Sequence, residues 1–310
     1  MLIDKTDTSH SNDPADVAID HVANNYEHII LKLSLIPEKW IETYPLLGIF
    51  DFSITKHVFL LILVAFITVS SMIFLVQNYI SSKTKVPGKT MNFIEMIILY
   101  MRENVLKSFI GEKYYKDWDA LVYTIFFFVL IGNFLGLIPI FDFLGLINYL
   151  AGGIPVVKDL IHGGNTVTAN INLNFALATI TFGAFTIAGI KRYGFFHHWK
   201  NLAPPGLAWP LYFIVVPIEV MAMLIRPISL TLRLAGNMMG GHLALIIFTQ
   251  LFIIEIAKNY GIFAALGGSI FSVSLSIGVI FLEIIVAFIQ AYVFALLTAV
   301  YIGMAVNVDH

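Results

Sequence analysis

The chain has 310 residues, of which 58% are hydrophobic and only 12% are charged, and its mean hydropathy is +0.85. Soluble domains average roughly 45 to 50% apolar and about 25% charged residues, so this composition excludes an ordinary soluble domain and predicts a polytopic membrane protein. The formal net charge of −2 gives no indication of a nucleic-acid partner, and the absence of cysteine excludes disulfides, thiol nucleophiles and cysteine metal sites.

Residues 1–56 form an acidic block, which we interpret as an extramembrane tail. Its carboxylates outnumber four lysines and are Asp4, Asp7, Asp13, Asp16, Asp20, Glu27, Glu38, Glu42 and Asp51. We expect part of the tail, around Val22 to Leu35, to be helical. The predicted division is therefore an acidic tail, 1–56, and a membrane domain, 57–310.

Three apolar runs are each long enough to cross a bilayer once, which takes about 20 residues. They are Val58–Ile80, roughly Leu121–Ile140, and Ile171–Ile190. Basic residues follow the first and third runs, whereas the tail before the first run is acidic; the basic residues are Lys83, Lys85, Lys89, Lys191, Arg192 and Lys200. Because basic loops stay in the cytoplasm, we predict a periplasmic N-terminus and a cytoplasmic C-terminus.

Between the first two runs, Met91 to Ile110 alternates apolar and polar residues at helical spacing. Phe93, Met96 and Tyr100 fall among the apolar positions, and Glu95 and Arg102 among the polar ones. This pattern predicts an amphipathic helix on the cytoplasmic membrane interface rather than a further span.

Two longer apolar stretches follow, Leu207–Ile254 and Ile262–Val306, and each exceeds 40 residues. Each could be two crossings or one long tilted helix. Two crossings in the first stretch would need a turn near Arg233 to Gly241, at bilayer depth and without charged flanks. We therefore predict an all-α membrane protein with five membrane-embedded helices, the last two long, tilted and paired as an antiparallel hairpin.

Arg233 is the most unusual residue of these stretches, because a guanidinium cannot shed its charge when it is buried in a bilayer. On a helix, Glu219, Arg226 and Arg233 share one face, and Asn237 lies one turn beyond. A functional role is favoured for Arg233. For Arg226, a snorkelling or paired structural charge is an equal alternative.

Small residues follow Arg233, namely Ala235, Gly236, Gly240 and Gly241. Glycine costs a helix roughly 0.8 to 1 kcal/mol relative to alanine, so several together favour close approach by another helix. Ordinary internal packing is the alternative.

The last stretch also has a polar face, formed by Glu283, Gln290 and Tyr301. In an antiparallel hairpin, His242 and Glu283 would both lie toward the outer end, and Gln290 would reach the depth of Arg233. A carboxylate near an imidazole can exchange protons near neutral pH, although a static buried pair is the alternative. His242 lies about 180° from Arg233 on a helical wheel, so a shared path requires curvature, a bulge or lateral displacement.

The sequence contains no phosphate-binding glycine loop, metal-ligand cluster or nucleophile elbow. We therefore predict no catalytic residues, no cofactor and no metal. The consecutive His197 and His198 are interpreted as interfacial anchors rather than metal ligands.

The segment from Pro227 to Met238, Pro-Ile-Ser-Leu-Thr-Leu-Arg-Leu-Ala-Gly-Asn-Met, strongly resembles subunit a of rotary F-type ATP synthases. The resemblance extends from about Lys56 to His310. Four further segments support it: Val86-Pro87-Gly88-Lys89, Asn133-x-x-Gly136-Leu137-x-Pro139, Thr168-Ala169-Asn170-Ile171-Asn172 and Gln290-Ala291-Tyr292-Val293-Phe294.

The resemblance implies a role for each matching residue. Arg233 matches the family's essential arginine, which faces the ion-binding carboxylate of each passing c-subunit. Asn237, His242, Glu283 and Gln290 match positions of the external half-channel, and Glu219 matches a carboxylate of the cytoplasmic half-channel. Many bacterial members carry Glu and then His where this chain has His242 and Glu283, so the acid and the imidazole are exchanged. Asn170 also departs from relatives that have an acid there.

The function implied by the resemblance is that of a non-catalytic, proton-translocating stator subunit in the membrane Fo sector. Its implied partners are a c-subunit ring, b-type peripheral stalk subunits and the rest of the F1Fo complex, in a bacterial inner membrane. A self-contained ion channel or secondary transporter is the alternative; such transporters often contain inverted repeats, and no repeat is evident.

Overall fold

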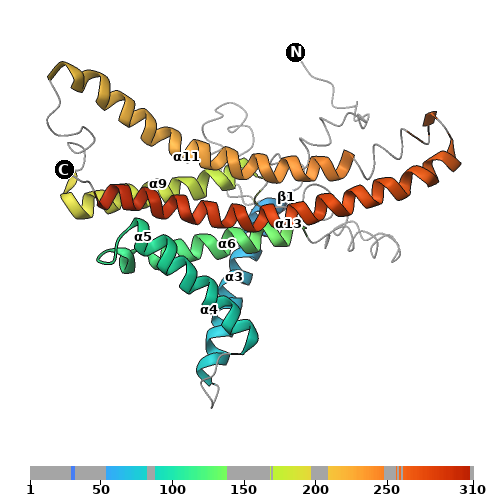
Figure 1. Cartoon of the computed structure of the whole chain (residues 1–310), viewed down its shortest axis with the longest axis horizontal. Helices are drawn as coiled ribbons and strands as arrows, with labels where there is room; N and C mark the ends of the chain where they lie inside the picture. The colour runs from blue at the N-terminus through green and yellow to red at the C-terminus, as the bar shows by residue number, and fades with distance from the viewer. Residues whose placement is uncertain are drawn as a thin grey trace. The chain divides into compact units, whose positions relative to one another are not determined.

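The computed structural model describes residues 29–31, 54–81, 88–137, 168, 170–196, 209–247, 256, 258–259 and 261–307. Its elements are β1 (Ile29–Leu31), β2 (Ile54–Thr55), α3 (Lys56–Ser81), α4 (Lys89–Met101), the π-helical turn η3 (Arg102–Leu106), α5 (Lys107–Phe109), the 3₁₀ turn η4 (Tyr115–Asp117), α6 (Asp119–Leu137), α9 (Ile171–Tyr193), α11 (Trp209–Ile246) and α13 (Ile262–Val306) (Figure 1).

Five of the described helices are long and apolar enough to cross a membrane, which confirms the predicted number. The qualifying segments are Val58–Ser81, Asp119–Leu137, Ile171–Tyr193, Phe213–Gly241 and Gly267–Val306. α11 and α13 are continuous helices of 38 and 45 residues, so within its described residues neither helix turns back, and no turn lies near Arg233 to Gly241. α13 has the predicted bounds, whereas the predicted end of the preceding stretch, beyond residue 247, lies outside the described residues.

Many hydroxyl groups inside these helices donate to a carbonyl of their own helix. Eight threonines and serines donate to the carbonyl four residues earlier, at 2.7 to 2.9 Å: Thr68, Thr124, Thr179, Thr186, Thr231, Ser274, Ser276 and Thr298. A hydroxyl bonded in this way adds little cost in an environment without water. The polar residues of these runs are therefore compatible with membrane-spanning helices.

The chain divides into two compact units. Unit 1 combines Met1–Ile62, Leu135–Asn170 and Asn237–Ile284, and unit 2 combines Leu63–Phe134, Ile171–Gly236 and Ile285–His310. α11 thus continues from unit 2 into unit 1, and α13 continues from unit 1 into unit 2. Arg226 of α11 meets Tyr301 of α13 in unit 2, and Gly241 meets Glu283 in unit 1, so the later residue of α11 meets the earlier residue of α13. The two helices are therefore antiparallel, as predicted.

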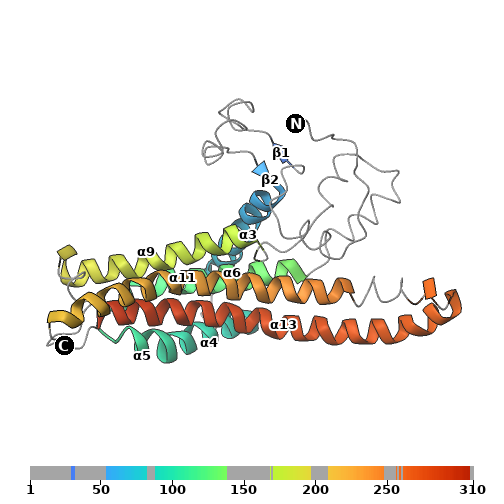
Figure 2. The same ribbon diagram turned by 90° about the horizontal axis from the view of Figure 1, so that it is seen from above.

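Unit 2 has an apolar core to which α6, α9 and the second half of α13 contribute (Figure 2). Phe126, Phe185 and Phe294 are its largest fully buried side chains. Edge-to-face ring contacts join Phe126 to Phe288 and Phe185 to Tyr301, each with centroids 6.2 Å apart. Such contacts add specific geometry to the burial of apolar area.

Hydrogen bonds between helices fix the register of this core. Asn133 Nδ2 of α6 donates to the Ala287 carbonyl at 3.0 Å. The hydroxyls of Thr181 on α9 and Thr298 on α13 lie 3.2 Å apart. Because the Thr298 hydroxyl already donates to Phe294 O, Thr181 must be the donor of this bond.

The end of α13 also packs tightly in unit 2. A Cβ at Gly303 would overlap the Phe109 carbonyl oxygen. Asn307 Nδ2 donates to the Ile110 carbonyl at 3.0 Å, and the Tyr193 hydroxyl donates to the Val306 carbonyl at 2.9 Å. Glycine at 303 is therefore required by close approach of two backbones.

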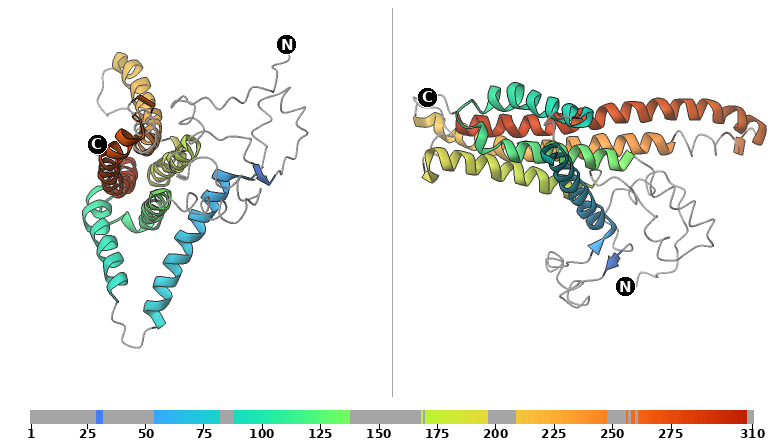
Figure 3. Two further views of the ribbon diagram at one scale, coloured as in Figure 1. Left: turned by 90° about the vertical axis from the view of Figure 1, so that its right-hand side faces the viewer. Right: turned by 90° about the horizontal axis from the view of Figure 1, so that it is seen from below.

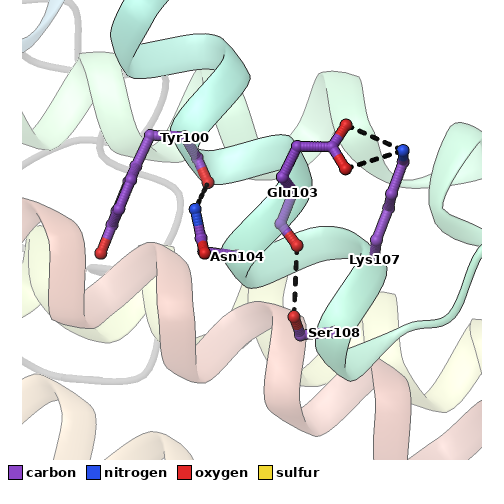
Figure 4. A network of polar contacts seen from close by, with 5 residues as sticks. All are labelled: Tyr100, Glu103, Asn104, Lys107 and Ser108. Atoms are coloured by element: carbon purple, nitrogen blue, oxygen red, sulfur yellow. Dashed lines mark hydrogen bonds and ion pairs between the residues drawn. The ribbon is translucent and has the colours of Figure 1, made fainter.

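Residues 91–110, predicted to be one amphipathic helix, form α4, η3 and α5. Figure 3 shows α4 as a helix distinct from α3. The wide turn η3 carries the polar contacts drawn in Figure 4, in which the Ser108 hydroxyl donates to the carbonyl of Glu103 and Lys107 pairs with the Glu103 carboxylate at 2.8 Å. That hydrogen bond to the carboxylate raises the pKa of Lys107. The helix is confirmed, and its position at the membrane interface stays a prediction.

The helix predicted around Val22 to Leu35 is wrong for Ile29–Leu31, which forms β1. β1 pairs antiparallel with β2, with Ile29 opposite Thr55 and Leu31 opposite Ile54. Branched and apolar residues gain cross-strand partners in such a pair, which a local helix does not provide. The rest of the predicted helix lies outside the described residues.

Candidate functional site

Arg233 lies on an exposed face of α11. Its neighbours along the helix are buried in unit 2, with Leu230 and Leu234 at 1% and 0% exposure. Arg233 itself is exposed, together with Leu232 and Gly236. The helix therefore uses one face for its own core and directs the guanidinium away from it.

The four small residues after Arg233 serve two different surfaces. Ala235 is 2% exposed in unit 2, and Gly241 lies against the Glu283 side chain in unit 1. In contrast, Gly236 and Gly240 are exposed, and a Cβ added at either would meet no atom within 4 Å. Internal packing therefore accounts for Ala235 and Gly241, but not for Gly236 and Gly240.

Two polar residues of unit 2 that the sequence analysis singled out differ in burial: Gln290 lies in the interior of the unit and Glu219 at its edge. Gln290 is 3% exposed on α13, one turn beyond Ala287, whose carbonyl accepts the Asn133 amide. Glu219 is half-buried on α11. Sequence reasoning placed these residues on polar faces, and the structure assigns Gln290 to the packed side.

Arg226 has a partner that sequence reasoning did not identify. Its Cζ lies 5.4 Å from the centroid of the Tyr301 ring, a cation–π contact within unit 2. The Tyr301 ring in turn contacts Phe185. Both Arg226 and Tyr301 had been noted on polar faces, but their pairing depends on the register of the two helices.

In unit 1, the carboxyl group of Glu283 is enclosed. Glu283 is 4% exposed, and neither carboxyl oxygen has a hydrogen-bond partner among the described residues. A Cβ at Gly241 would overlap Oε1 and lie 2.9 Å from Cδ. The absence of a side chain at Gly241 is what makes room for this carboxyl group.

His242 follows Gly241 directly, and its backbone belongs to α11, but its side chain lies outside the described residues. The close approach of Gly241 to Glu283 nevertheless places the backbone of His242 one residue from the carboxyl group. Asn237, one turn after Arg233, is exposed.

Two buried serines of unit 1 were missed by the sequence analysis. Ser272 and Ser276 are 0% and 5% exposed on α13, and the Ser276 hydroxyl donates to the Ser272 carbonyl at 2.8 Å. Their spacing from Glu283 puts all three on one face of a helix. The spacing alone could have identified them as an extension of the polar face.

Comparison with known proteins assigns most of the chain to one family. The family profile described as ATP synthase A chain matches residues 58–303. A protein named ATP synthase subunit a 2 from Chlorobium luteolum is 34% identical over 299 residues, which cover 96% of this chain and 77% of the relative. ATP synthase subunit a from Myxococcus xanthus is 32% identical, over 85% of this chain and 76% of the relative.

These matches confirm the resemblance found at Arg233 and its flanking segments, and they give no support to a self-contained channel or secondary transporter. They also agree with the absence of a catalytic motif in the sequence, because subunit a has no catalytic role of its own. With five apolar helices among its described residues that are long enough to span a membrane, the chain belongs to the ATP synthase subunit a family, the multi-pass, proton-translocating stator subunits of the Fo sector.

Proposed function

We propose that the exposed face of α11 around Arg233 runs against a ring of c-subunits and meets their ion-binding carboxylates. The observation that carries this proposal is the combination of an exposed guanidinium with Gly236 and Gly240, whose missing side chains leave open space on the same helix. Small residues let a partner helix approach closely in a membrane. A guanidinium remains charged and so attracts a deprotonated carboxylate.

The external half-channel would be formed by Asn237, His242, Glu283 and Gln290. Glu283 supports this because its carboxyl group is enclosed and has no hydrogen-bond partner among the described residues, and an ionisable group at such depth is costly unless it has a use. His242, whose backbone is adjacent, would exchange protons with it.

The cytoplasmic half-channel would begin at Glu219. Its half-buried position on α11 is compatible with a carboxylate that is reached by water from one side only. With two offset half-channels and Arg233 blocking a direct leak between them, protons cross only when the ring rotates. Each charge moved through the field gains about 2.3 kcal/mol per 100 mV.

The finer assignments of partners and location belong to the same proposal. The complex would include b-type peripheral stalk subunits and lie in a bacterial inner membrane, with a periplasmic tail of residues 1–56 before the membrane domain, 57–310. The basic residues Lys191 and Arg192 at the end of α9 would face the cytoplasm, as the positive-inside rule expects.

The deciding experiment compares ATP-driven acidification of inverted vesicles that carry the assembled complex with wild-type chain or with Arg233→Ala. Loss of pumping is expected although the complex assembles, because the charge acts in translocation rather than in packing. Leu232→Ala is the matched control, since Leu232 is the neighbouring exposed side chain and carries no charge. Undiminished pumping by the Arg233→Ala complex would overturn the proposal.

A further inference from the structure

A second cationic site lies in unit 2, where α6 begins and α9 ends. Two cations share one aromatic ring there: Arg192 Cζ lies 4.9 Å, and Lys113 Nζ 5.4 Å, from the centroid of the Tyr114 ring. Both charged side chains are exposed, whereas Tyr114 packs against the apolar core. The Tyr114 ring, which is held by the core, therefore brings the positive charges of Lys113 and Arg192 close together.

Arg192 is held by a second ring as well. Its Cζ lies 5.6 Å from the centroid of Tyr193, whose hydroxyl is anchored to the Val306 carbonyl. A guanidinium that stacks on an aromatic ring keeps its N–H groups, which lie in the guanidinium plane, available as donors. These donors match the geometry of two phosphate oxygens.

Two cations near this site, Lys191 and Lys107, are paired with carboxylates. Lys191 pairs with Asp117 at 2.9 Å, and Lys107 pairs with Glu103 at 2.8 Å. Across the part of the chain that the structure describes, no ion pair joins Lys113 or Arg192 to a carboxylate. Like charges around one ring repel each other unless an anion joins them, so the site is electrostatically suited to an anion.

The position of the site along the spans favours a lipid over a soluble anion. One candidate span begins at Asp119 and another ends at Tyr193, so we expect the cluster to lie near the lipid headgroups when these helices cross a membrane. Trp118 and Tyr193 are half-buried aromatic residues of the kind that line a membrane interface. Two exposed apolar rings follow Arg192 by three and four residues, since Phe195 and Phe196 are 57% and 87% exposed with centroids 5.6 Å apart.

We propose that Lys113, Tyr114 and Arg192 form a binding site for the phosphate of an anionic phospholipid. Arg192 donates hydrogen bonds to two phosphate oxygens, Lys113 adds a second charge, and the lipid's apolar part lies over Phe195 and Phe196. The proposal concerns a lipid that stabilises the subunit, and it does not depend on the route of the protons.

The test uses the assembled complex reconstituted in phosphatidylcholine vesicles that contain a small fraction of photoreactive phosphatidylglycerol. After illumination, mass spectrometry of peptides measures labelling of residues 113–118 and 191–196. A photoreactive phosphatidylcholine serves as the neutral probe. A parallel sample contains excess inorganic phosphate, which would compete for a site that binds free anions.

Wild type should label these segments several-fold more with the anionic probe than with the neutral one. A cation near an anionic membrane surface contributes about 1 kcal/mol, or about fivefold in binding, so Lys113→Gln or Arg192→Gln should each reduce the anionic labelling about fivefold. Lys191→Gln is the matched control and should leave labelling unchanged, because the charge of Lys191 is already paired.

The variant Tyr114→Leu tests whether the lipid binds a specific site around the Tyr114 ring or is attracted only by the positive charge of the surface. It keeps both cations and an apolar side chain against the core, but removes the ring that gathers them, so labelling should fall. Equal labelling by both probes, an unchanged Arg192→Gln variant, or loss of labelling with inorganic phosphate would each overturn the proposal. Lys113→Gln alters only an exposed side chain, so the test remains decisive if an Arg192 variant fails to assemble.

Discussion

Gly241→Ala should displace the carboxyl group of Glu283. Non-bonded carbon atoms pack about 3.5 to 4.0 Å apart, whereas the new Cβ would lie 2.9 Å from Cδ and Cγ of Glu283 and overlap Oε1. The carboxyl group must therefore retreat by at least about 0.6 to 1.1 Å. Overpacking of this kind costs about 1 to 3 kcal/mol.

The assay is the initial rate of ATP-driven acidification in inverted vesicles, normalised to the amount of assembled complex. If the proposed proton path uses the observed position of Glu283, a displacement energy of about 1 to 3 kcal/mol corresponds to a fall in the initial rate of acidification of about 5- to 150-fold. Gly183→Ala is the matched control, because a Cβ there meets no atom within 4 Å. Shortening the acid, as in the double variant Gly241→Ala with Glu283→Asp, should restore part of the rate by relieving the overlap. Pumping within twofold of wild type in assembled Gly241→Ala complexes would refute the reasoning.

Three other predictions follow from contacts described above. Gly303→Ala should lower thermal stability of the complex by about 1 to 3 kcal/mol, because the new Cβ meets a backbone carbonyl that cannot rotate away; unchanged inactivation temperatures would contradict this. Thr298→Val should lower the thermal stability of the complex by about 0.5 to 1.5 kcal/mol, since the Thr181 hydroxyl loses its acceptor. Adding Thr181→Val should lower the stability little further, and fully additive losses would show that the pair is not coupled. Exchanging His242 and Glu283 should preserve more pumping than changing either one to Ala, and equal losses in all three variants would argue against a relay pair.

Helix existence could be predicted from the sequence because it depends on local composition. The run from Ile262 to Val306 is apolar throughout, so its bounds in α13 agree with the prediction. The single long helix α11 could also be predicted, because a turn at Arg233 would leave backbone groups unsatisfied in the bilayer. The strand β1 could not, since its partner β2 lies far along the chain and the local pattern gives no sign of it.

The candidate site could be predicted only in part. The identity of Arg233, Glu283 and Gln290 follows from their charge or polarity in apolar runs and from the family resemblance. The division of the small residues between an internal face at Gly241 and an exposed face at Gly236 could not be predicted. It depends on which side of α11 packs against its own chain, and this is set by the register between helices rather than by the sequence of either one.

The bonds that join α13 to the earlier helices can form only late in synthesis, because α13 is the last helix of the chain. The acceptor for Asn133, the Ala287 carbonyl, is synthesised 154 residues later, and the acceptor for Thr181, the Thr298 hydroxyl, 117 residues later. At about 5 to 20 residues per second, the ribosome needs roughly 8 to 30 seconds to cover the longer separation. α6 and then α9 are completed during that interval, while the side chain of Asn133 has no Ala287 carbonyl to bind. Until α13 is inserted, the insertion machinery or a neighbouring polypeptide must shield the Asn133 amide from the lipid. A delay in synthesis between α9 and α13 would therefore affect membrane insertion of the chain rather than the equilibrium stability of the finished protein.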